Sequence, residues 1–157
     1  MRDKPEATIV EAAAGAAYAV HRAYRSATSG EILPTWGNAV VEFKNRLRAA
    51  ARKALEQELR DGEAIHASFL EEKAADGWKL TDAVTKDERT KLHPYLVPWA
   101  ELPEHERAAR SLFAATVQGA AIAVASDLVA EERSMRVRAQ KRDREALAAI
   151  RRRVEPK

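Results

Sequence analysis

Residues 7–29 read ATIVEAAAGAAYAVHRAYRSATS, and this alanine-rich stretch decides the fold class. Its apolar side chains recur at three- and four-residue steps, the spacing of one face of an α-helix: Ile9, Ala13, Ala17, Val20, Tyr24 and Ala27. The pair Ser29-Gly30 ends this helix. Alanine fills about a fifth of the 157 positions and aromatic residues only 6%, a composition that favours closely packed helices over sheet.

Three further helices are expected along the chain. The second follows Pro34 and Gly37 and runs to about Arg60, because Asp61-Gly62 is a stop signal. The third covers 63–75, and the fourth begins after Pro103 and runs beyond Leu128. Extended pieces are expected around 77–84 and 95–99. The shared core is predicted to include Leu70, Leu96, Leu102, Leu112, Phe113 and Val117.

These elements predict a mainly α protein, α+β only through a minor extended segment. The architecture is a bundle of about four helices packed on a short extended region. The length suits a single domain of ordinary size. The chain has no cysteine, which excludes disulfides, thiolate metal sites and cysteine nucleophiles.

Charge and hydropathy indicate where the protein acts. The start of the chain is charged, and the longest apolar run, 119–126, falls short of the roughly 20 residues of a membrane span. We expect a cytoplasmic protein without membrane contact. The net charge of +3 hides an asymmetry, since residues 133–157 hold ten basic and three acidic residues, a net of +7.

The stretch from His66 to Phe113 carries a set of spaced motifs. They are His66-Ala-Ser68, Lys73 ahead of Asp76-Gly77-Trp78, Lys86-Asp87, Lys91-Leu-His93-Pro94-Tyr-Leu96-Val97-Pro98-Trp99, and Leu102-Pro103-Glu104-His-Glu106-Arg107. Together they resemble the ryanodine receptor repeat, or RyR domain, which occurs in tandem in calcium-release channels and as single copies in bacterial and phage proteins. The sequence departs from that pattern where Trp99 replaces a tyrosine and Arg110 an aspartate, and it lacks a glycine three residues after Trp78.

The resemblance implies three segments and a ligand site. Residues 1–62 would be an N-terminal helical extension, 63–125 the repeat, and 126–157 a basic charged C-terminal helix or tail. Trp78 would be a platform on which a planar ring stacks; the alternative is that Trp78 plugs the core. The resemblance also assigns ligand binding to further residues: Lys73, His66, Lys86, Asp87, Lys91, His93, Trp99 and Arg107.

The cations of this set suit phosphate, Arg through bidentate hydrogen bonds and Lys as a point charge. The alternative is that they are paired on the surface, Lys86 with Asp87 or Glu88 and Arg107 with Glu104. His93, which precedes Pro94, has the alternative role of a structural hydrogen bond. We expect no metal, because His66 and His93 lack a carboxylate or third ligand at metal spacing. We expect no cofactor and no enzymatic activity, since the sequence has no phosphate loop, nucleophile elbow or HExxH helix.

The resemblance therefore implies a protein that binds a small nucleotide-like molecule, such as a cyclic ADP-ribose-type signal, without converting it. A free-standing copy suits sequestration of such a messenger, as in a phage or bacterial anti-defence protein. A homodimer would supply the second half of the cleft. The alternatives are a nucleic-acid-associated protein that uses the basic residues of 133–153, and a structural or adaptor protein.

Overall fold

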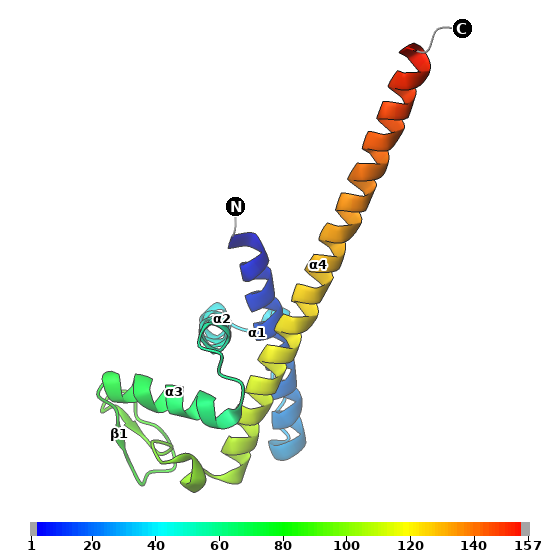
Figure 1. Cartoon of the computed structure of the whole chain (residues 1–157). Helices are drawn as coiled ribbons and strands as arrows, with labels where there is room; N and C mark the ends of the chain where they lie inside the picture. The colour runs from blue at the N-terminus through cyan, green and yellow to red at the C-terminus, as the bar shows by residue number, and fades with distance from the viewer. Residues whose placement is uncertain (1–2, 155–157) are drawn as a thin grey trace. The chain divides into compact units, whose positions relative to one another are not determined.

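The computed structural model describes residues 3–154, with the side chains of residues 6–149. Helices make up 74% of the chain, which confirms that it is mainly helical (Figure 1). In chain order the described elements are α1 (Asp3–Ser29), η1 (Trp36–Asn38), α2 (Val41–Glu56), α3 (Gly62–Ala75), β1 (Lys79–Leu80), β2 (Leu92–His93), η2 (Trp99–Glu101) and α4 (Glu104–Val154). The chain divides into two compact units between Ala121 and Ile122.

Small side chains form the core of the first unit. Ala13, Ala14 and Ala17 of α1 meet Ala51 and Ala54 of α2, and Val117 of α4 completes the cluster. Side chains of this size let the axes of two helices approach closely. The alanine-rich stretch of α1 is therefore buried because α1 and α2 pack close together. The core prediction is confirmed for Leu102 and Val117, which are buried, and it is wrong for Leu112, which is 38% exposed.

The connection from α2 to α3 differs from the prediction. α2 ends at Glu56, four residues before Arg60, and Glu58 takes a positive φ of 51°. Asp61 accepts a hydrogen bond from the backbone N–H of Ala64 at 2.8 Å and so caps the start of α3. The Asp61-Gly62 pair therefore begins the third helix and does not stop the second, because an Asp carboxylate satisfies the free N–H groups of a first turn.

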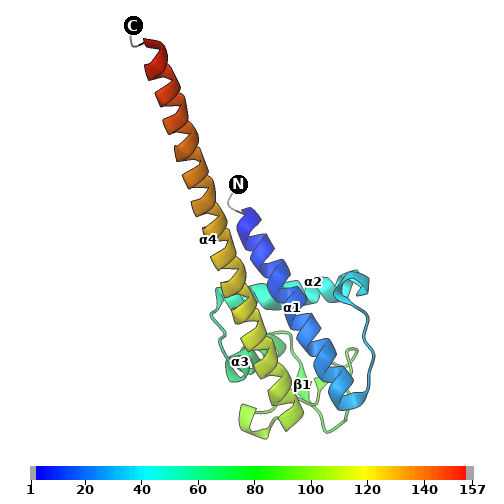
Figure 2. The same cartoon turned by 90° about the vertical axis from the view of Figure 1, so that its right-hand side faces the viewer.

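A two-strand parallel sheet joins the segments on either side of a long loop, beside α3 (Figures 1 and 2). Lys79 is opposite Leu92 and Leu80 opposite His93. The first expected extended piece, 77–84, contains β1. The second, 95–99, contains no strand, because a 3₁₀ turn begins at Trp99, and β2 lies just before it.

α4 continues as one helix to Val154. Among the described helices, one stretch within Glu104–Ala149 is long and apolar enough to cross a membrane by length and composition, with a mean hydropathy of 1.6. Core helices of soluble proteins meet the same criterion, although only 11% of this stretch is buried. The end of the predicted basic tail, 155–157, and the side chains of Arg151, Arg152 and Arg153 lie outside the described residues.

Candidate functional site

His93 is the centre of an aromatic cluster formed by α3, β2 and the turn after β2. Its ring centroid lies 5.2 Å from that of Phe69, 6.0 Å from that of Trp78 and 5.7 Å from that of Tyr95. The Nδ1 atom accepts a hydrogen bond from the backbone N–H of Tyr95 at 3.1 Å. This bond is the structural hydrogen bond that was the alternative role for His93, and it places the proton of the neutral ring on Nε2.

Two cations of the first unit lie on aromatic faces next to this histidine. The Nζ of Lys73 lies 4.4 Å from the ring centroid of Trp78, and the guanidinium of Arg110 lies 5.2 Å from that of Phe69. A cation within about 6 Å of a ring centroid is attracted by the negative face of the ring. The cluster therefore combines aromatic surface with fixed positive charge.

A cavity of about 290 Å³ opens beside His93. Its lining combines rings and charges from α3, α4 and the loop between the strands: Phe69, Val84, Lys86, His93, Pro94, Tyr95, Glu106 and Arg110. Glu106 accepts a hydrogen bond from Arg110 at 2.6 Å, one helical turn away, and Glu88 accepts one from Lys86 at 2.6 Å. Of the two alternative surface partners expected for Lys86, Asp87 and Glu88, the structure shows Glu88.

The charges around the cavity act on His93. Burial lowers the pKa of His93 below its ordinary value, and Lys73, Lys86 and Arg110 lower this pKa further, while Glu106 opposes them. Three cations and one carboxylate thus face the imidazole. Lys86 and Arg110 are each hydrogen-bonded to a carboxylate, Glu88 and Glu106, so an anion that entered the cavity would compete with these carboxylates for the two cations.

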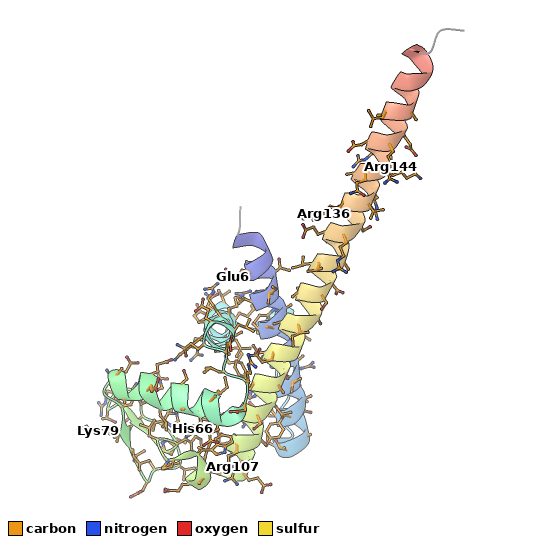
Figure 3. The ribbon with its side chains drawn as sticks, viewed as in Figure 1. Glu6, His66, Lys79, Arg107, Arg136 and Arg144 are labelled. Carbon is orange, nitrogen blue, oxygen red and sulfur yellow. The ribbon has the colours of Figure 1, made fainter. Side chains whose placement is uncertain are left out.

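The structure separates the other predicted site residues from this cavity. His66 lies on α3 (Figure 3). It is 1% exposed, and its Nε2 lies 2.7 Å from the carbonyl oxygen of Val97. Its ring also lies 6.0 Å from that of Trp99. These two contacts join α3 to the segment after β2. His66 and Trp99 therefore hold these two elements together and do not line the cavity.

Three more predicted residues hold backbone turns. Lys91 donates to the carbonyl of Asp76 at 2.6 Å, and Arg107 donates to that of Ala100 at 3.1 Å. Asp87 accepts from the backbone N–H groups of Thr90 at 3.3 Å and of Arg89 at 2.9 Å. Its hydrogen bonds to Thr90, and after them the one to Arg89, lower the pKa of Asp87. Only Lys86 and His93 of the predicted set line the cavity, with Lys73 and Trp78 next to them.

Sequence reasoning missed four polar or aromatic residues of the lining: Phe69, Tyr95, Glu106 and Arg110. Arg110 was noted only as a departure from the repeat pattern. One signal for it was present, because Glu106 and Arg110 are four residues apart on a helix, the spacing of an intrahelical ion pair.

Comparison with protein families, with curated proteins and with solved structures finds no match to this chain. The resemblance to the ryanodine receptor repeat therefore stays a prediction that rests on the motifs quoted above.

Proposed function

We propose that the first unit binds a small anionic molecule with a planar ring in the cavity beside His93. The observation that carries the proposal is that Lys86 and Arg110 line one cavity together with the rings of Phe69, His93 and Tyr95. The Nζ of Lys73 lies close by on the ring of Trp78, 4.4 Å from its centroid. A guanidinium and an ammonium group bind phosphate oxygens, and the exposed parts of the rings offer apolar faces to a base. The volume of about 290 Å³ is close to the lower end of ligand pockets, which suits a molecule of nucleotide size.

The resemblance narrows the ligand class to nucleotide-like signals of the cyclic ADP-ribose type. We propose binding without conversion, as in a messenger-sequestering anti-defence protein of phage or bacterial origin. Sequestration requires affinity alone. In the part of the chain that the structure describes, the Nδ1 of His93 accepts a hydrogen bond from a backbone N–H, and nearby cations lower the pKa of its imidazole. The RyR-like fold, and a homodimer in which a second copy faces the site, belong to the same proposal.

Calorimetric titration with a panel of adenine nucleotides, cyclic ADP-ribose isomers and pyrophosphate tests this function. We expect Arg110→Gln and Lys86→Gln to weaken binding of the phosphorylated ligands. Lys79→Gln is the matched control, since Lys79 is an exposed lysine of β1 that does not line the cavity. Arg110→Lys keeps the charge but loses the bidentate geometry, and we expect an intermediate affinity. Absence of heat for every ligand at millimolar concentration would contradict the proposal.

A second candidate function rests on the basic part of α4. Arg136 and Arg144 project from this helix (Figure 3), and exposed cations along a helix neutralise phosphates of nucleic acid. Replacing Arg138, Arg142 and Arg144 by Gln together distinguishes the two functions. The substitutions should abolish salt-dependent binding of DNA or RNA and leave a small-molecule site in the first unit intact.

A further inference from the structure

The second unit exposes an apolar stripe on α4. Ile122 is 67% exposed, Val129 48%, Val137 65% and Leu147 60%. At about 100° per residue, their positions fall on one side of the helix within roughly 80° of arc. Ala125, Ser126, Ala130 and Arg133 surround Val129 and line a shallow hollow there, and Arg133 falls within the same arc as the apolar residues. An apolar stripe of this length on a single helix is typical of a surface that packs against another helix.

The charges along this helix are divided between its two halves. Residues 122–132 hold three acidic and no basic residues, a net of −3. Residues 133–149 hold six basic and two acidic residues, a net of +4. Two such helices attract each other when they run in opposite directions, because each acidic half then lies along a basic half. In a parallel pair the like-charged halves would lie together.

Charged residues that flank the stripe and the apolar residues at its two ends give nearly the same antiparallel register. A twofold axis near Ser134 places Glu132 opposite Arg136 of the second copy. With the same axis, Ile122 lies one residue away from the position directly opposite Leu147 of the second copy. Glu132 and Arg136 already form an intrahelical ion pair of 2.6 Å, with 58% and 75% of their side chains exposed. Both therefore remain accessible for a charge network across the axis, which also includes Arg133 of each copy, one residue from the axis.

We propose that a second copy of this chain packs antiparallel along residues 122–149 of α4. One self-complementary surface suffices for such a twofold dimer. The inference goes beyond the proposed function, and this interface differs from that of the site-facing homodimer named there, because the ligand cavity lies in the first unit and α4 pairing uses none of its residues.

Charge reversal tests the register in the full-length chain. In Glu132→Arg, the new arginine faces Arg136 of the second copy, and we expect the dimer dissociation constant to rise about tenfold or more. Arg136→Glu should do the same. The double variant Glu132→Arg/Arg136→Glu restores every opposite-charge pairing and should restore the dimer, as measured by sedimentation at micromolar concentration.

A matched control breaks an equivalent pair away from the stripe. Lys141 and Glu145 form an i,i+4 pair of 3.9 Å, and Glu145 lies on the opposite side of the helix from Val129. Glu145→Arg makes the same change of charge on the same helix. We expect its dissociation constant to stay within twofold of the parent protein, so an equal loss of dimer in this variant would overturn the proposal.

Cross-linking gives an independent readout, because the chain has no native cysteine. Under oxidation, a mixture of the single variants Ile122→Cys and Leu147→Cys should form mixed disulfide dimers. Each variant alone should form far fewer. Cross-links of each variant to itself would indicate parallel pairing and overturn the proposal.

Two further outcomes would also overturn it. One is a strict monomer at micromolar concentration that instead cosediments with anionic lipid vesicles, which would assign the stripe to a lipid surface. The other is a dimer that survives Glu132→Arg but is lost in Trp78→Ala, which would place the dimer interface at the ligand site.

Discussion

The first residue of α3, Gly62, lies against Ser111 of α4. A Cβ atom built on Gly62 would be 2.5 Å from the Oγ of Ser111 and 2.8 Å from the ring of Trp99. Both distances are shorter than real Cβ contacts, so only glycine lets the start of α3 touch α4. This contact positions Phe69 of α3 near Arg110 of α4. Both residues line the candidate cavity.

Gly62→Ala should therefore destabilise the protein. Backbone shifts that relieve such overpacking typically cost about 1–3 kcal/mol. The matched control is Gly119→Ala, also in a helix, where an added Cβ meets nothing within 4 Å. That variant should gain up to about 1 kcal/mol from helix propensity. Urea unfolding measures both, and equal effects would contradict the close approach of α3 to α4.

Truncation of two leucines tests the burial pattern of the first unit. Leu102 is 2% exposed and Leu112 is 38% exposed. We expect Leu102→Ala to lose about 2–5 kcal/mol of unfolding free energy, because the deletion leaves a cavity. Leu112→Ala makes the same chemical change at the surface and should lose clearly less. Melting temperatures in the reverse order would contradict the burial assigned to Leu102, just before α4, and to Leu112, within α4.

The depressed pKa of His93 predicts a loss of stability in acid. An imidazole whose pKa is lower in the folded state than in the unfolded state binds fewer protons when folded. The free energy of unfolding should therefore fall as the pH drops below the ordinary value of 6.5 and level off below the folded-state pKa. His21, whose pKa is lowered by burial and by Arg25, contributes with the same sign.

His93→Gln isolates the share of this residue. Its unfolding midpoint should change less than that of the parent protein between neutral pH and pH about 5. Equal changes in the two proteins would contradict the lowered pKa. An anionic ligand should raise the pKa of His93, so the affinity of the protein for that ligand should increase on acidification. An NMR titration of the His93 imidazole measures this shift in pKa.

The role of Trp78 depends on whether a ligand can replace Lys73 on its ring. If the ring is a stacking platform, Trp78→Ala should weaken binding by about 1–3 kcal/mol, the usual contribution of base stacking on an aromatic side chain. Trp36→Phe is a control, since Trp36 packs on α1 beside Gly15. Unchanged affinity in Trp78→Ala would contradict the stacking role. The contact between Lys73 and the Trp78 ring would then be structural only.

Local signals in the sequence were enough for most of the helices. The first helix ends at Ser29 as predicted, and the third covers Gly62–Ala75 against an expectation of 63–75. Apolar periodicity and stop signals act within a few residues, so they can be found without knowing the fold. Asp61-Gly62 was misread because the same pair can end one helix or cap the next, and here Asp61 caps α3 through its hydrogen bond from the backbone N–H of Ala64.

The composition of the candidate site was decided by tertiary structure. The sequence by itself determined that rings and cations are dense between His66 and Arg110, and it identified His93 and Lys86. Which of them meet depends on the return of the loop after β1, where Lys91 takes a φ of 53° and strand β2 pairs in parallel with β1. That return brings His93 onto Phe69, and the packing of α3 on α4 adds Arg110 and Glu106. Contacts between residues so far apart in the chain follow from how whole elements pack, and no local spacing encodes them.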